Sequence, residues 1–426
     1  MARCVFFINP FYGHINPTLS LVKELVNSDE EVIYYSLNKF KDLVEGAGAI
    51  YKEYHKRYGN SIFNWDRIDD PAKERGDNRL LEYHYGKHSF IFTDSCKQIV
   101  DDFVEQLADI KVDYIIYDYF DAVWGKQVAL KLGIPAISTV PSFAISKKMV
   151  ERISDEQFQN QYLRLSGMQA GELGGGSKRT LELVEQTIRF KYRQRDFSIY
   201  DYGNSELLNI VFTSKYFQPY GEAFDDTFAF VGASVEHRDG EYPFSIEFPD
   251  DRQLIYISLG TTKANENEHF YQDCIKAFSG MEVNVLMSVG DNIDIHSLGE
   301  VPENVIVRQS APQLQVLEHA ALFITHGGMN SVTEALHYEV PMLLFPQHGD
   351  QYANASRVIE LGAGIILEGN APNFHEQIRE AALAVLEDGI YKYNAGQISE
   401  TLRSSGGVKK AVGKITILKE QGIISI

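Results

Sequence analysis

The amino-acid sequence predicts an α/β protein made of two consecutive domains, each built on a parallel β-sheet. Its 426 residues exceed the usual size of a single hydrophobic core. Short apolar runs typical of buried strands alternate with helical segments from the first residues onward. Near residue 235 a charged stretch containing Gly240 and Pro243 interrupts this alternation, which then restarts.

The first half opens with a strand–helix–strand unit. An apolar run at residues 4–8 predicts a strand. Asn16 followed by Pro17 predicts the start of a helix, because Asn caps helices and Pro is tolerated at the first helical position. A second strand is expected at residues 31–35 and a second helix at 38–45. Such a unit implies parallel strands joined by a right-handed crossover.

The rest of the first half is less regular. Residues 55–105 are rich in aromatic side chains and irregular. A buried-type strand at 114–118 leads through a helix to a further strand at 133–138. The polar stretch 145–207 predicts helices interrupted by a flexible Gly-rich loop at 171–177.

The second half repeats the alternation of strands and helices. The expected strands lie at 254–260, 283–289, 305–307, 322–325 and 341–345, with helices at 267–279, after residue 330 and toward the C-terminus.

The domain boundaries follow from these elements. We expect an N-terminal domain over residues 1–234, a linker over 235–250 and a C-terminal domain over 251–405. A last helix within 406–426 is expected to pack back on the N-terminal domain. In parallel sheets, ligands bind at the carboxyl ends of the strands, so the loops after the strands are where functional residues are expected.

Composition narrows the classes of partner and location. The formal net charge of −19 disfavours nucleic acid and anionic membranes, because both attract clustered Lys and Arg. No apolar run approaches the roughly 20 residues of a membrane span, and the start lacks a signal-peptide pattern. Cys4, Cys96 and Cys274 are widely spaced, which is typical of reduced thiols. We expect a cytoplasmic protein; the sequence does not decide its oligomeric state.

The most informative segment is residues 326–334, with the sequence His-Gly-Gly-Met-Asn-Ser-Val-Thr-Glu. The two glycines follow an apolar strand, and glycine allows positive φ and close approach of the backbone to a ligand. A helix then starts near Asn330 and Ser331, and its unpaired amides and positive dipole end form an anion site. His326 can add a donor to a phosphate oxygen. Taken alone, the segment is also compatible with a plain strand–turn–helix.

Residues further along favour a ligand larger than phosphate. Glu334 lies one helical turn beyond Asn330, where a carboxylate can accept hydrogen bonds from a ribose diol. Asp350 and Gln351 follow another strand and suit the hydroxyls of a hexose. The turn at residues 258–262 offers further hydroxyl groups to a phosphate.

The segment from Ser310 through Gln351 resembles the donor-binding signature of the family-1 UDP-glycosyltransferases. The resemblance extends over essentially the whole chain, and is greatest to bacterial macrolide- and flavonoid-type members. It implies the GT-B fold, in which two Rossmann-like parallel-sheet domains face each other across a cleft. It also implies a donor site with diphosphate contacts from Thr261, His326, Gly328, Asn330 and Ser331, ribose contacts from Glu334, sugar contacts from Asp350 and Gln351, and base contacts around Ala311 and Gln313.

Two positions depart from the pattern of the plant members of this family. Those members carry Trp where this chain has Ser310 and Met329, and the first of these indoles stacks on uracil. By analogy with bases stacked on aromatic side chains, such a loss costs about 1–3 kcal/mol. Thymidine and other nucleotide sugars therefore stay open as donors beside UDP-sugars.

The first half supplies a candidate base. His14 follows the first strand, and Asp118 ends the strand at 114–118. An acceptor hydroxyl is a poor nucleophile until a base takes its proton, and His paired with a carboxylate is suited to that role near neutral pH. The resemblance places His14 and Asp118 on the catalytic pair of the family. Asp121 is a nearby alternative to Asp118, disfavoured by its position at the start of the next helix.

Aromatic side chains of the first half suggest where an acceptor could bind. They could line an apolar cavity for a flat or hydrophobic molecule, or they could be ordinary core residues. The candidates are Phe11, Phe63, Trp65, Phe90, Tyr119, Phe120 and Phe143.

Together these observations predict an inverting glycosyltransferase that moves a hexose, expected to be glucose, from UDP to a hydroxyl of a small hydrophobic acceptor. The inversion follows from the resemblance. No cofactor is expected, because the UDP-sugar is a co-substrate. No divalent metal is expected either, because the chain contains no Asp-x-Asp pair and no His/Cys cluster with ligand spacing. Two alternatives stay open: a sugar-nucleotide epimerase or hydrolase of the same fold, and a non-catalytic subunit that binds a sugar nucleotide.

Overall fold

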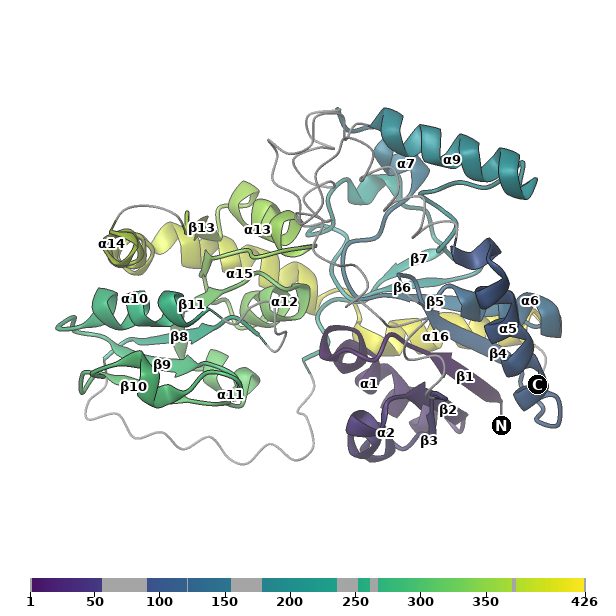
Figure 1. Cartoon of the computed structure of the whole chain (residues 1–426), viewed down its shortest axis with the longest axis horizontal. Coiled ribbons are helices and arrows are strands. Elements are labelled where there is room, and N and C mark those ends of the chain that lie inside the picture. The colour runs from purple at the N-terminus through teal and green to yellow at the C-terminus, as the bar shows by residue number, and fades with distance from the viewer. Residues whose placement is uncertain are drawn as a thin grey trace. The chain divides into compact units, whose positions relative to one another are not determined.

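The computed structural model forms two compact units, each with one parallel sheet flanked by helices, which confirms the predicted fold class (Figure 1). It describes residues 2–55, 90–120, 122–154, 178–235, 252–260, 267–369 and 373–424. The first unit contains the described residues up to Ser234 and those from Ser405 onward, and the second contains those from Val235 to Ser404. The expected linker at 235–250 lies outside the described residues except for Val235.

The sheet of the first unit has the strand order β3-β2-β1-β4-β5-β6-β7, and every neighbouring pair is parallel. The order reverses between β1 and β4, which pair directly with Phe7 opposite Tyr117. The strands are β1 (Arg3–Phe7), β2 (Glu31–Ser36), β3 (Ile50–Glu53), β4 (Tyr114–Asp118), β5 (Ala136–Val140), β6 (Asn209–Val211) and β7 (Phe228–Phe230).

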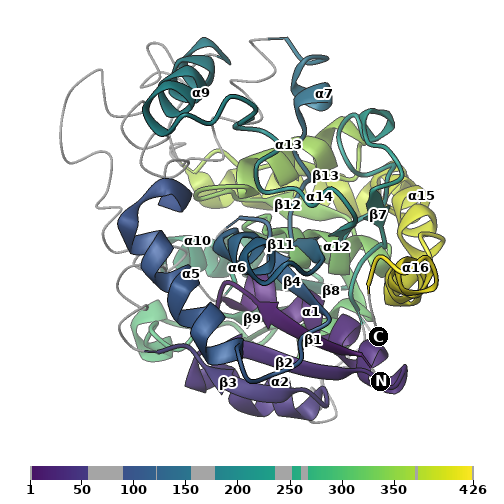
Figure 2. The same cartoon turned by 90° about the vertical axis from the view of Figure 1, so that its right-hand side faces the viewer.

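Side chains of β1 alternate between the two faces of this sheet, because successive strand residues point to opposite sides. Cys4, Phe6 and Ile8 join one buried cluster, together with residues of α1 (Tyr12–Asn27), α2 (Lys41–Gly46) and α16 (Gly407–Glu420). Val5 and Phe7 join another, with α5 (Asp94–Leu107) and α6 (Trp124–Leu132), which Figure 2 shows in front of the sheet. Two further α-helices of this unit are α7 (Lys147–Val150) and α9 (Lys178–Tyr192).

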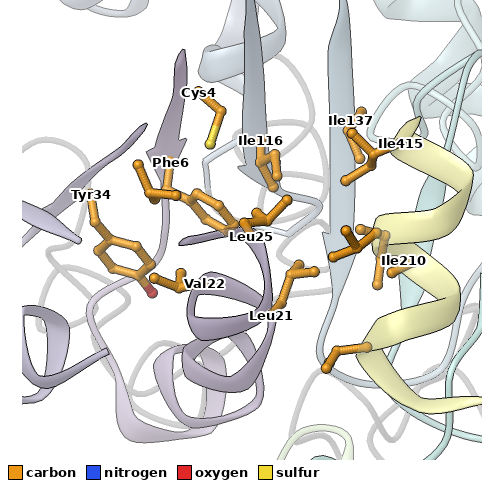
Figure 3. Close-up of a cluster of buried hydrophobic side chains, with 14 of the residues drawn as sticks. Cys4, Phe6, Leu21, Val22, Leu25, Tyr34, Ile116, Ile137, Ile210 and Ile415 are labelled. Atoms are coloured by element: carbon orange, nitrogen blue, oxygen red, sulfur yellow. The ribbon is translucent and has the colours of Figure 1, made fainter. Parts of the chain in front are cut away.

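The last helix of the chain, α16, is part of the first unit's core. Figure 3 shows Ile415 of α16 beside Ile137 and Ile210 of the sheet, in the cluster that also holds Leu21 of α1. A buried polar contact adds to this packing. Lys419 of α16 forms an ion pair with Glu30, whose other carboxylate oxygen accepts a hydrogen bond from the Tyr114 hydroxyl.

The predicted start of the first helix is wrong. The helix α1 begins at Tyr12 instead of Pro17, because the Phe11 carbonyl already accepts hydrogen bonds from the amides of His14 (3.0 Å) and Ile15 (2.9 Å). Pro17 lies inside the helix, where it removes one backbone hydrogen bond. His14 therefore stands in the first turn of a helix, where its position is better defined than in a loop.

The second unit repeats the strand order of the first, as β10-β9-β8-β11-β12-β13, again with parallel neighbours. Here the order reverses between β8 and β11. The strands are β8 (Leu254–Ser258), β9 (Asn284–Ser288), β10 (Val305–Arg308), β11 (Ala320–Thr325), β12 (Met342–Leu344) and β13 (Gly364–Ile366). The helices are α10 (Glu268–Phe278), α11 (Gln313–Leu317), α12 (Met329–His337), α13 (Gln351–Glu360), α14 (Phe374–Glu387) and α15 (Gly389–Arg403).

Aromatic packing fixes one face of the second sheet. Phe270 of α10 stacks on Phe345 with ring centroids 4.6 Å apart, and Phe374 of α14 packs against Phe345. These rings belong to the buried cluster that joins α10 and α14 to β8 and β9. Because Phe345 directly follows β12, this packing also fixes where the loop after β12 begins.

The sequence predicts the other strands, including the short β10 and β12, but not β3, β6, β7 and β13. Each of these four contains three or four residues, too few to show a periodic pattern. The predicted Gly-rich loop at 171–177 lies outside the described residues. The three cysteines are buried free thiols. Among the described helices, none is both long and apolar enough to cross a membrane.

The Lys419–Glu30 ion pair yields a stability prediction. Replacing Lys419 with Met leaves a buried carboxylate without its cation, so we expect the first unit to lose about 3–5 kcal/mol of unfolding free energy. Urea denaturation followed by tryptophan fluorescence measures this, because Trp124 is buried in the same unit. Lys414→Met is the matched control, since Lys414 makes an exposed contact with the Asp226 carbonyl from the same helix. Equal, small losses in both variants would show that the buried pair does not stabilise the unit.

Candidate functional site

Functional side chains gather at the same topological position in both units. In each sheet, the strand order reverses between two neighbouring parallel strands, β1 and β4 in the first unit and β8 and β11 in the second. The loops leaving such a pair diverge to opposite faces of the sheet, so side chains at the two carboxyl ends can meet around a ligand. The candidate base lies at the first of these positions, and the Gly-Gly turn at the second.

In the first unit, the structure brings His14 and Asp118 together. Nδ1 of His14 lies 2.7 Å from Oδ2 of Asp118. The other carboxylate oxygen accepts a hydrogen bond of 2.9 Å from the Phe120 amide. The Asp118 side chain is fully buried, whereas that of His14 is 22% exposed. A buried carboxylate held by two donors can orient the imidazole and stabilise its protonated form.

Three residues that sequence reasoning missed hold the elements that carry this pair. The Tyr54 hydroxyl both accepts a hydrogen bond from the Ile8 amide and donates one to the Ile8 carbonyl, each at 2.9 Å, at the end of β1. Thr18 bonds the Ile15 carbonyl and the Tyr34 hydroxyl, each at 2.7 Å, and so ties α1 to β2. No local pattern identifies the Tyr54–Ile8 and Thr18–Tyr34 contacts, because each joins positions distant in sequence.

The aromatic candidates for an acceptor site differ in their surroundings. Phe11, Phe90 and Phe120 are half-buried. Tyr119 is buried against Gly203, where an added Cβ would come within 2.8 Å of the Tyr119 ring. Phe143 is buried against Phe217 with ring centroids 5.5 Å apart. Tyr119 and Phe143 are therefore packed as core side chains, while Phe63 and Trp65 lie outside the described residues.

In the second unit, the imidazole of His326 is packed between two glycines. An added Cβ on Gly328 would lie 2.4 Å from Nε2 of His326, and one on Gly260 would lie 2.7 Å from Cε1. Gly260 and Gly327 also have positive φ, of 81° and 83°. Glycine is thus required here both for backbone conformation and for space around the ring.

The pKa of His326 is lowered to about 3, first by burial and then by the neighbouring His348, although a hydrogen bond to the Ser258 carbonyl opposes this. Burial also lowers the pKa of His348, and the nearby Asp350 raises it. Both imidazoles are therefore neutral at physiological pH. A neutral ring has a single N–H, so His326 can donate one hydrogen bond, either to the Ser258 carbonyl or to a ligand.

The helix α12 begins directly after the Gly-Gly turn, with Gly328 at its N-cap. No described residue accepts a hydrogen bond from the Gly328 amide. Asn330 is half-buried in the first turn, and Ser331 is buried. The start of this helix has the donors and the positive dipole end that suit a phosphate group.

Gln313 joins the predicted base and ribose contacts. Its Nε2 donates to Oε2 of Glu334 at 2.6 Å and to Oγ of Ser331 at 3.3 Å. Glu334 is 2% exposed, which is unusual for a carboxylate without such partners. Ala311 is half-buried just before α11, while Thr261 lies outside the described residues.

The loop after β12 carries the predicted sugar contacts. Oε1 of Gln351 accepts hydrogen bonds from the amides of Gln347 (2.8 Å) and His348 (3.2 Å), and its Nε2 lies 3.3 Å from Nε2 of His348. Gln351 thus holds the loop, and Asp350 is the more accessible of the predicted pair. Among the described residues, no three His, Cys, Asp or Glu side chains gather in a way that could hold a metal ion.

Sequence reasoning missed two residues of the second unit that lie among the predicted ones. The His348 imidazole interacts electrostatically with both the His326 imidazole and the Asp350 carboxylate. Asn354 is fully buried and contacts both Gly327 and Asp350. A signal for Asn354 existed, since it lies four residues after Asp350 and hence on the same side of α13.

Comparison with known proteins places both units in one group of enzymes. Residues 274–417 match the family described as erythromycin biosynthesis protein CIII-like, C-terminal domain. The NDP-glycosyltransferase YjiC of Bacillus subtilis (strain 168) is 34% identical over 420 residues, covering 97% of each chain. YojK of the same organism, described as an uncharacterized UDP-glucosyltransferase, is 29% identical over 419 residues, again covering 97% of each chain.

A solved structure extends this similarity to the fold. The calicheamicin glycosyltransferase CalG4 has a TM-score of 0.76 to this chain at 26% identity, and the match covers 98% of both chains. The shared fold therefore includes both units.

The lowered pKa of His326 predicts how the second unit responds to acid. In the unfolded chain, the His326 imidazole has an ordinary pKa of about 6.5 and takes up a proton as the pH falls below that value. In the folded unit, the same imidazole stays neutral down to about pH 3. Stability should therefore fall with decreasing pH across this window, His326 contributing up to about 1.4 kcal/mol per pH unit.

Denaturation of wild type and His326→Gln between pH 7 and pH 4 tests this, and the variant should show the smaller dependence on pH. His269→Gln, which removes an exposed imidazole from α10, should keep the wild-type dependence. An unchanged dependence in His326→Gln would contradict the assignment.

Proposed function

We propose that this chain is an inverting, metal-independent hexosyltransferase. It belongs to the UDP-glycosyltransferase superfamily, as a natural-product type glycosyltransferase of family 1 with the GT-B fold. Its donor would be a UDP-sugar, with glucose as the expected hexose. Its acceptor would be a hydroxyl of a small hydrophobic molecule such as a flavonoid, a macrolide or another phenolic natural product.

The observation that carries this proposal is the contact between His14 and Asp118. Nδ1 of His14 is 2.7 Å from the buried Asp118 carboxylate, at the carboxyl ends of the two strands where the sheet order reverses. The carboxylate would hold the proton on Nδ1, which makes Nε2 the nitrogen that accepts a proton. A binding protein without catalysis has no need for an imidazole prepared in this way.

The reaction makes one bond and breaks one bond. As the acceptor hydroxyl gives its proton to Nε2 of His14, its oxygen attacks the anomeric carbon of the donor sugar. The bond between that carbon and the diphosphate oxygen breaks on the opposite face, and UDP leaves with the electron pair. Attack opposite the leaving group inverts the anomeric carbon, so an α-linked donor gives a β-linked product. Asp118 stabilises the imidazolium formed in this step.

The second unit would bind the donor and stabilise the leaving diphosphate. The start of α12 after Gly328 offers backbone amides and a positive dipole end to the developing charge, with Asn330 and Ser331 beside it. Glu334 would accept hydrogen bonds from the ribose hydroxyls, once Gln313 is displaced from one of its oxygens or shares it. Asp350 would accept hydrogen bonds from the sugar, while Gln351 keeps its loop in place.

The nucleobase of the donor is supported by fewer residues than the other parts of the proposal. Ser310, in the position where plant members carry an indole, is exposed, and Met329 is buried in α12. Neither provides an aromatic platform for a base. One relative carries UDP-glucosyltransferase in its name and another the more general NDP-glycosyltransferase. UDP is our choice of donor nucleotide, and thymidine diphosphate sugars are the first competitors to compare with it.

The remaining parts of the proposal concern metal, acceptor and location. The positive end of α12 can stabilise the diphosphate without a divalent ion. Phe11 lies three residues before His14 and Phe120 two residues after Asp118, and both are half-buried, which suits contact with an apolar acceptor. Three buried free thiols support a location in the cytoplasm, because free cysteines persist in reducing compartments.

Replacing His14 with Ala should lower kcat for transfer by about 10²- to 10⁴-fold, because the acceptor loses its base. The affinity for UDP, measured by calorimetry, should stay unchanged, since the proposed donor residues belong to the second unit. His296→Ala, which removes an exposed imidazole of the second unit, serves as the control. Turnover like that of wild type in His14→Ala would refute the role of this residue.

Removal of divalent ions should leave turnover unchanged. The measurement is the rate of UDP release during transfer after exhaustive treatment with EDTA, compared with the rate after Mg²⁺ or Mn²⁺ is added back. A rate abolished by the chelator and restored by either ion would contradict stabilisation of the diphosphate by the helix alone.

A further inference from the structure

We propose that Asn354 is a positioning residue of the donor site, which connects the diphosphate-binding turn to the sugar-binding carboxylate. Its side chain is fully buried in α13. Nδ2 of Asn354 donates to the Gly327 carbonyl at 3.0 Å and to Oδ2 of Asp350 at 3.2 Å. The inference rests on the proposed function, because it takes the turn and Asp350 to bind the two ends of one donor.

The contact with Gly327 sets the direction of a backbone amide. The peptide between Gly327 and Gly328 is planar and trans, so its N–H points away from its C=O. Because Asn354 holds the carbonyl in the protein interior, the Gly328 amide is directed to the opposite side, at the start of α12. Gly327, with φ of 83°, lets this peptide rotate more freely than a residue with a side chain would. A hydrogen bond from outside the turn, here from Asn354, is therefore needed to fix the orientation of the peptide.

The contact with Asp350 fixes the sugar end of the site. Oδ2 of Asp350 accepts from Asn354, and the Asn354 amide bonds the Asp350 carbonyl at 3.0 Å, so both backbone and side chain are held. Gly327 and Asp350 belong to loops after two different strands, β11 and β12. A single carboxamide therefore sets the spacing between two groups. One is the backbone amide that would donate a hydrogen bond to a phosphate, and the other is the carboxylate that would accept hydrogen bonds from the sugar.

Packing alone does not account for an asparagine at this position. Among the described residues, no group donates a hydrogen bond to the buried Oδ1 of Asn354. A buried polar atom without a partner destabilises the fold, so an apolar side chain of similar size would serve a merely structural role at least as well. The NH₂ group is the part of the side chain that the site uses.

Asn354→Ala and Asn354→Leu test this proposal, with Asn394→Ala as the matched control. Asn394 makes the same kind of bond, from its Nδ2 to the Gly362 carbonyl at 3.0 Å, at the turn between α13 and β13. For each variant, calorimetry gives the affinity for UDP, steady-state kinetics with UDP-glucose gives kcat and KM, and thermal denaturation gives stability. Asp350→Ala and the double variant with Asn354→Ala complete the set.

Both Asn354 variants should bind UDP about 10-fold more weakly, from the loss of one fixed amide contact. They should lower kcat by about 100-fold, because a misplaced donor reacts slowly. Asn354→Leu should be at least as stable as Asn354→Ala and equally inactive. Asn394→Ala should lose stability while keeping the wild-type affinity and kcat. In the double variant, the losses in kcat should not multiply, since both residues act through one contact.

Three results would overturn the inference. The first is a restored kcat in Asn354→Leu, which would assign the residue to packing. The second is an affinity and kcat in Asn354→Ala equal to those of Asn394→Ala, and the third is losses that multiply in the double variant. Each of these leaves the proposed function standing if the wild-type protein transfers glucose. A wild-type protein that neither binds UDP nor transfers a hexose would overturn the proposed function and this inference together.

Discussion

The reversal of strand order within each parallel sheet is the constraint on which the two sites depend. Between β1 and β4, and again between β8 and β11, the chain leaves neighbouring strands toward opposite faces of the sheet. At such a position no crossing helix covers the two strand ends, so residues from both can meet there. The pairs His14–Asp118 and His326–Gly260 are each formed in this way, although members of each pair lie far apart in sequence.

The same topology supports opposite electrostatics in the two units. In the first, a fully buried carboxylate faces the imidazole of His14, which favours a protonated ring after proton transfer. In the second, the imidazole of His326 is buried against glycine backbone and near a second imidazole, which favours the neutral ring. In the proposed reaction, the first arrangement prepares a base, and the second offers backbone amides and a helix terminus to the diphosphate.

The sequence was sufficient for features with a local signature. The long buried strands, the Gly-Gly turn at Gly327 and the helix after it have such signatures, and the resemblance added the pairing of His14 with Asp118. The start of α1 was misjudged, because Pro17 outweighed the hydrogen bonds that Phe11 offers to His14 and Ile15. Tyr54 was out of reach, since its contact with Ile8 joins residues 46 positions apart. Asn354 has a local signature, because its spacing of four residues from Asp350 places both on one side of α13.

Product analysis of one reaction distinguishes transfer to an acceptor from hydrolysis, epimerisation and binding without catalysis. The protein is incubated with UDP-α-glucose, with and without a flavonoid acceptor, and the products are followed by mass spectrometry and by the NMR signal of the anomeric proton. We expect a glucoside that forms only with the acceptor and carries the β configuration at the anomeric carbon. Free glucose released equally without acceptor, an epimerised nucleotide sugar, or bound UDP without any product would contradict this expectation.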